Sequence, residues 1–143
     1  MNWTRISSII IVGFTAIGAI YGGLSMVFMP SGGLLSLSTG LLDGSPFVDY
    51  LVPGIFLFVF VGLFHLAALI YLLKKLPRTK EVMFAAAAVL AVWMIVQLLI
   101  IGYVFILQII FLVVAAVEMF LAIQLKKQQK KRNIFIHLDY FSS

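Results

Sequence analysis

The sequence predicts an all-α membrane protein, a bundle of four transmembrane helices with both termini in the cytoplasm and a long outer loop between the first two spans. Its 143 residues are 64% apolar and only 10% charged, whereas an average soluble domain is about 45–50% apolar and about 25% charged. The apolar residues form runs of about 20 or more, the length that a helix needs to cross a hydrocarbon core about 30 Å thick. All ten Lys and Arg residues fall on one side of the resulting arrangement.

The first two spans are predicted at residues 6–29 and 50–73. The first carries no charge and ends at the helix-breaking sequence PSGG at 30–33. We interpret it as an uncleaved span rather than a signal peptide, because it exceeds the usual apolar length and lacks a small-residue cleavage site. In the second span, Pro53 and Gly54 lie in the first turn, where a missing backbone N–H costs little.

The third and fourth spans are predicted at residues 82–101 and 104–125, although no polar loop separates them. One continuous helix from residue 82 to residue 125 would be roughly 66 Å long, about twice the hydrocarbon thickness. A fold-back is therefore required. We expect it at Gly102 and Tyr103, because glycine adopts the positive φ of a tight turn and tyrosine is common at the headgroup level.

The distribution of basic residues predicts the orientation and the domain organisation. Arg5, the run at residues 74–80 and the sequence KKQQKKR at 126–132 hold all the cations, so the positive-inside rule makes both termini cytoplasmic. Residues 1–132 are expected to form one membrane domain in a plasma membrane. The tail, residues 133–143, is expected to lie on the membrane surface or to be disordered. Because the basic run adjoins a span, we interpret it as an anchor to anionic lipid rather than a nucleic-acid site.

The outer loop, residues 30–49, contains five leucines, which an aqueous loop does not need. A short helix is expected at residues 34–42, lying in the membrane interface or covering the bundle. Two interpretations remain open: a lid over an outward-facing cavity, or a loop that simply packs onto the helix ends.

Two ionisable residues lie within the predicted spans, His65 in the second and Glu118 in the fourth. An ionisable group in a bilayer costs at least about 2.5–3.5 kcal/mol at the centre, so it is a candidate functional residue. Counting along the spans places both at nearly the same depth. They are either partners in proton or cation handling, or a structural pair.

A second polar layer is expected in the outer half of the last two spans, where Gln97 and Gln108 lie at similar depth. Trp93 is one helical turn before Gln97 and shares its face. These residues either hydrogen-bond across the helical hairpin or line a small-ligand site. In the first span, Gly18, Gly22 and Gly23 provide a face for close helix approach, within the bundle or in a homodimer.

Catalysis and cofactor binding are not expected. The chain contains no cysteine and only two histidines, and no phosphate-binding loop, nucleophile elbow or zinc-protease motif is found. A haem held by two intramembrane histidines would need a partner for His65, but His137 lies in the tail.

Several short motifs resemble a recurring group of small bacterial four-span membrane proteins that have no assigned activity. They are PSGG at 30–33, LDGSPFVDYLVPG at 42–54, WMIVQ at 93–97, IGY at 101–103 and LQ at 107–108. The likeness extends over residues 10–125 and implies the same topology in a bacterial inner membrane.

Two classes of function follow as expectations. The first is a non-enzymatic membrane module that binds lipid, a membrane protein partner or a second copy of itself through the outer loop and the bundle face. The second is a small transporter in which Glu118 and His65 handle protons or a cation.

Overall fold

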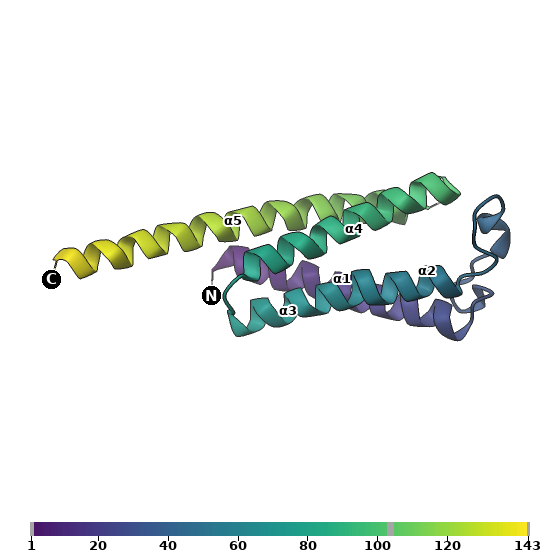
Figure 1. The fold of residues 1–143 in the computed structure, drawn as a ribbon, viewed down its shortest axis with the longest axis horizontal. Coiled ribbons are helices and arrows are strands. Elements are labelled where there is room, and N and C mark those ends of the chain that lie inside the picture. The colour runs from purple at the N-terminus through teal and green to yellow at the C-terminus, as the bar shows by residue number, and fades with distance from the viewer. Residues whose placement is uncertain (1, 103–104, 143) are drawn as a thin grey trace.

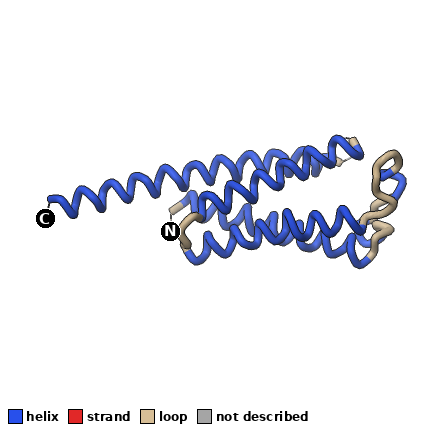
Figure 2. Tube along the Cα trace, in the orientation of Figure 1, coloured by secondary structure: helices blue, strands red, loops and turns tan. Residues whose placement is uncertain are grey.

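The computed structural model describes residues 2–102 and 105–142, and the described chain is helical with no β-strand (Figure 2). Helix α1 (Trp3–Phe28) is followed by a loop, and then α2 (Leu51–Phe56) runs through the π-helix η3 (Leu57–Leu63) into α3 (Phe64–Lys74). Two further helices, α4 (Thr79–Ile101) and α5 (Ile106–Ser142), complete the chain. Among the described residues, four helices, with the α2–η3–α3 segment counted as one, are long and apolar enough to cross a membrane, which confirms the predicted all-α four-helix bundle.

The helices form an elongated bundle (Figure 1), and its two ends carry different residues. The first end, here called the basic end, brings together the start of α1, the α3–α4 connection at residues 75–78 and residues 126–132 of α5. The other, here called the loop end, carries residues 29–50. The ten cations are thus held at one end of the molecule, as the predicted topology requires.

The last helix differs from its predicted bounds. α5 continues to Ser142 and projects beyond the bundle (Figure 1). Residues 133–142, for which disorder was one expectation, are therefore helical with exposed side chains. The predicted fold-back begins at Gly102, whose φ of +70° suits glycine. Tyr103 and Val104, where the prediction placed the rest of the turn and the start of the fourth span, lie outside the described residues.

Close packing between α1 and the second helix depends on glycines. A Cβ atom on Gly23 would lie 2.7 Å from the Phe58 nitrogen, and one on Gly54 would lie 2.5 Å from the Met26 Cβ. Of the three glycines predicted to form a packing face, Gly23 and Gly22 therefore face η3. Gly18 does not, because it is exposed with no atom within 4 Å of its Cβ position.

The loop packs onto the helix ends. Two short 3₁₀ turns, Gly33–Leu35 and Thr39–Leu42, replace the single helix expected at residues 34–42. They are separate because Ser36 adopts a left-handed conformation with φ of 55°. Leu42 is buried against Met26 and Tyr50, and the Tyr50 hydroxyl donates to the Ser38 carbonyl at 2.7 Å. This packing supports the interpretation in which the loop simply packs onto the helix ends, rather than the one in which it is a lid over a cavity.

Candidate functional site

A buried polar cluster joins three helices inside the bundle. The Nε2 atom of His65, from α3, lies 2.9 Å from Oε2 of Glu118, from α5. The hydroxyl of Thr15, from α1, donates to Glu118 Oε1 at 3.1 Å. His65 and Glu118 are 0% exposed and Thr15 is 1% exposed. The two ionisable residues that were predicted to lie at one depth are thus hydrogen-bonded partners.

Local helix geometry helps to orient the histidine. His65 is the second residue of α3 and follows the π-helix η3 directly. Its Nδ1 atom lies 2.8 Å from the carbonyl oxygen of Val61, which belongs to η3. Single π-helical segments inside α-helices recur at functional sites. The ring is therefore fixed from both sides, by the backbone at Nδ1 and by Glu118 at Nε2.

These contacts determine the protons that the cluster holds. A carbonyl oxygen only accepts, so His65 Nδ1 carries a hydrogen and donates to Val61. One further proton then lies between His65 Nε2 and Glu118 Oε2. If the carboxyl group holds it, both residues are neutral; if the ring holds it, they form an ion pair. The net charge is zero in either arrangement, which suits an apolar interior.

Thr15 is the member of the cluster that sequence reasoning missed. Its hydroxyl oxygen also lies 2.9 Å from the Ile11 carbonyl oxygen, so the single hydroxyl hydrogen is shared between that oxygen and Glu118 Oε1. Ser8 and Ser25 make the same contact with the carbonyl four residues earlier, which is ordinary behaviour for hydroxyl side chains in helices. The only available signal was a hydroxyl residue in an apolar span, and Ser7, Ser8 and Ser25 carry the same signal.

The second predicted layer is arranged differently from the expectation. Gln108 is buried, donates to the Gly102 carbonyl and accepts from the Phe105 N–H, each at 3.1 Å. It satisfies the carbonyl of Gly102, which caps the end of α4, and the N–H of Phe105, just before α5; helix termini leave such groups without intrahelical partners. None of the described hydrogen bonds joins it to Gln97, which is half-buried in α4. The Nε1 atom of Trp93 is buried and has no hydrogen-bond partner among the described residues.

Two concavities lie at the basic end, and sequence reasoning predicted neither. The first, here called the basic pocket, has a volume of about 450 Å³. Its lining comes from α1, the α3–α4 connection, α4 and α5, and consists of Asn2, Arg5, Lys75, Leu76, Pro77, Thr79, Lys80, Leu125, Gln128 and Arg132.

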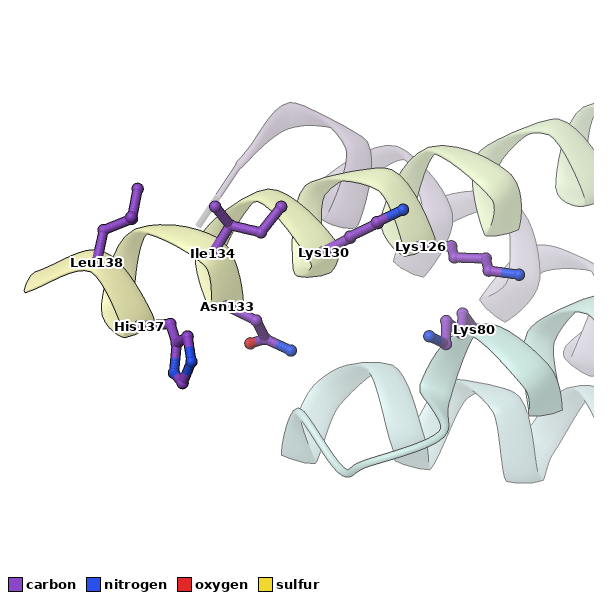
Figure 3. A pocket seen from close by; sticks show the side chains of 7 residues that line it. All are labelled: Lys80, Lys126, Lys130, Asn133, Ile134, His137 and Leu138. Atoms are coloured by element: carbon purple, nitrogen blue, oxygen red, sulfur yellow. The ribbon is translucent and has the colours of Figure 1, made fainter. Parts of the chain in front are cut away.

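The second concavity, here called the tail groove, has a volume of about 580 Å³ and lies between α4 and the projecting part of α5 (Figure 3). It is lined by Lys80, Lys126, Lys130, Asn133, Ile134, His137 and Leu138. Lys80 lines both concavities. The concave surface at this end therefore combines clustered positive charge with apolar side chains of the tail.

The described residues contain no group of three or more His, Asp or Glu side chains that could hold a metal ion. The described side chains are suited to proton exchange within the buried cluster and to binding of anions at the basic end. Comparisons with known protein families, curated proteins and solved structures give no match for this chain.

Proposed function

We propose that this protein is a non-enzymatic membrane module that binds lipid through the basic end of its bundle. The observation that carries the proposal is the contrast between its two polar regions. The buried cluster of His65, Glu118 and Thr15 satisfies its own hydrogen bonds without exposure. The basic end, by contrast, presents two open concavities lined by cations.

Orientation supports anionic lipid as the ligand class. The positive-inside rule assigns the basic end to the cytoplasmic face, which we take to be that of a bacterial inner membrane. Anionic lipids of that leaflet attract each nearby Lys or Arg by about 1 kcal/mol. The apolar side chains of the tail, including the exposed Phe135, Leu138 and Phe141, are suited to lie at the same interface.

Binding through the outer loop, the other expectation, has less support because that loop packs on the bundle. Leu42 and Tyr50 are each 5% exposed, and of the other Leu, Phe and Val side chains of the loop only Leu34 and Val48 are exposed. A membrane protein partner or a second copy therefore remains an alternative outcome of the test rather than part of the proposal.

Native mass spectrometry of the protein released from nanodiscs tests the proposal. Nanodiscs of phosphatidylcholine and phosphatidylglycerol in equal amounts offer both headgroups under one condition. We expect retained adducts to be enriched in phosphatidylglycerol. Equal retention of both lipids, or release of a homodimer or hetero-complex without lipid, would contradict a lipid-binding function.

A second candidate function is a small proton- or cation-coupled transporter. The observation that favours it is the buried contact of His65 Nε2 with Glu118 Oε2 at 2.9 Å in the interior of the bundle, because ionisable residues within membrane helices commonly mark ion pathways. Proteoliposomes with an imposed pH gradient test it by uptake of an organic cation. Uptake by the wild type and by Glu81→Gln, but not by Glu118→Gln, would favour the transporter, because Glu81 is an exposed carboxylate outside the cluster. Absence of uptake in all three proteins would exclude it.

A further inference from the structure

We infer that the basic pocket binds a phosphate group, and that its source is the headgroup of an anionic phospholipid. This inference rests on the proposed lipid-binding function and assigns it to one site. Four cationic residues, Arg5, Lys75, Lys80 and Arg132, line the pocket.

The positive charges converge from separate parts of the chain. Arg5 comes from α1, Lys75 from the α3–α4 connection, Lys80 from α4 and Arg132 from α5. No Asp or Glu is among the residues that line the pocket. Glu81, which is exposed, has its Oε1 atom 3.6 Å from Lys80 Nζ. Like charges around one concavity repel each other, and a bound anion would replace that repulsion with attraction.

Hydrogen bonds hold the walls of the pocket in place. The Nη1 atom of Arg5 donates to the Leu72 carbonyl at 2.7 Å, which fixes the guanidinium against the last turn of α3. Asn2 donates to Gln128 at 2.8 Å, and Gln128 donates to the Thr4 hydroxyl at 3.0 Å, so α1 is tied to α5. A guanidinium carries five N–H donors, and the bond to Leu72 leaves others for a ligand.

The start of α4 adds a second, independent feature that favours an anion. The residue before this 23-residue helix, Arg78, has φ of 64°, and its side chain makes no capping hydrogen bond, although Glu81 lies in the first turn. The first N–H groups of a helix lack intrahelical partners and carry partial positive charge. Thr79 and Lys80, the first two residues of α4, both line the pocket. Backbone donors and cationic side chains at one helix start form a ready phosphate site.

Position favours a lipid headgroup over a free phosphate. The pocket lies where the apolar helices end, which is the depth of the phosphates in a bilayer that the bundle spans. Leu125, the last residue before the basic run of α5, also lines it. The tail groove shares Lys80 with the basic pocket and adds the apolar side chains of Ile134 and Leu138. Apolar side chains beside a cationic pocket suit an amphiphilic ligand better than a fully hydrated ion.

Two double variants of equal charge separate this site from general surface attraction. K75Q/R132Q removes two cations from the pocket, and both side chains are exposed. K127Q/K131Q removes two cations from the same basic run of α5, from residues that line neither concavity. Thermal unfolding in detergent is measured first, and both variants are expected to unfold like the wild type.

Titration with short-chain phosphatidylglycerol in detergent then gives the affinities. We expect K75Q/R132Q to weaken binding about thirtyfold and K127Q/K131Q to weaken it less than about fivefold, because the first pair loses direct charge-assisted bonds as well as surface attraction. Equal losses would overturn the site but leave the lipid-binding function standing. No preference of the wild type for phosphatidylglycerol over phosphatidylcholine would overturn both.

Inorganic phosphate distinguishes the two sources of the ligand. We expect phosphate to compete with phosphatidylglycerol only weakly, because it gains nothing from the tail groove. Tight binding of phosphate that K75Q/R132Q abolishes, with no binding of phosphatidylglycerol, would overturn the lipid assignment and identify a site for a soluble anion.

Discussion

His65 and Glu118 satisfy each other in the interior of the bundle, where both side chains are 0% exposed. A neutral or ionised pair with one shared proton has no net charge, whereas a single buried member leaves a polar group unpaired. Thr15 adds a bond to the second carboxyl oxygen. The chemical form of the residue at position 118, rather than its size, therefore decides whether the cluster remains satisfied.

Substitutions of Glu118 are expected to separate hydrogen bonding from charge. Glu118→Gln keeps an acceptor for Thr15 and supplies an N–H donor to His65 Nε2, so we expect it to cost less than about 1 kcal/mol of unfolding free energy. Glu118→Ala leaves both partners unsatisfied and opens a cavity, and we expect a loss of about 2–4 kcal/mol. Unfolding of each variant by a denaturing detergent measures the difference. Equal losses would show that the cluster is not held by these hydrogen bonds.

Tyr50, at the loop end outside the spans, is expected to give a pH-dependent contribution to stability. Burial raises the pKa of its phenol above the ordinary value, because the charged form loses hydration. The stability that the protonated Tyr50 phenol contributes is fully present below the unfolded-state pKa of about 10. It is lost as the pH rises through the higher folded-state pKa. In Tyr50→Phe the bond to Ser38 is lost, at a cost of about 0.5–1.5 kcal/mol, and alkaline destabilisation should be smaller. Unfolding free energies of both proteins between neutral and strongly alkaline pH test this, and parallel curves would contradict it.

At the scale of elements, the contact between α1 and η3 depends on one glycine more than on its neighbours. A Cβ on Gly23 would approach the Phe58 backbone to 2.7–2.8 Å, whereas one on Gly18 would meet nothing within 4 Å. The same substitution at the two positions therefore has opposite physical consequences. One forces two helices apart, and the other only raises helix propensity.

Gly23→Ala and Gly18→Ala form a matched pair that tests this contact. We expect Gly23→Ala to destabilise the bundle by about 1–3 kcal/mol, because the helices must separate to accept the methyl group. Gly18→Ala should be neutral or stabilising by up to about 1 kcal/mol, because alanine favours the helix. Thermal unfolding in detergent compares them. A greater loss at Gly18 would mean that its exposed face is covered by another chain.

The number of helices was predictable because bilayer thickness fixes how much apolar sequence one span needs. Their rotation was not, because every face of such a span is apolar, so Gly18 and Gly23 looked equivalent. Depth could be counted along the chain, which is why His65 and Glu118 were placed at one level. Their contact with Thr15, the π-helix before His65 and the pockets at the basic end depend on how the helices pack, and packing leaves no local mark in the sequence.

At the scale of the whole molecule, the separation of charge between the two ends predicts the orientation. The basic end carries all ten cations, while the loop end carries Asp43 and Asp49. Since cationic loops are retained in the cytoplasm, we expect the loop end to face the opposite side. Both termini and the α3–α4 connection lie at one end of the bundle (Figure 1). The side of the membrane assigned to the basic end therefore also fixes the side of the loop end.

Single-cysteine labelling tests the orientation cleanly because the chain has no cysteine of its own. Val48, which is 92% exposed, reports the loop end, and Ser142, at the exposed end of α5, reports the other. In intact cells, or in spheroplasts where an outer membrane is present, we expect a membrane-impermeant maleimide to label Val48→Cys at once and Ser142→Cys only after the membrane is opened. The reverse pattern would invert the orientation and place the basic pocket on the outer face. Labelling of both from outside would mean that the termini and the loop share a side, which four spans cannot produce.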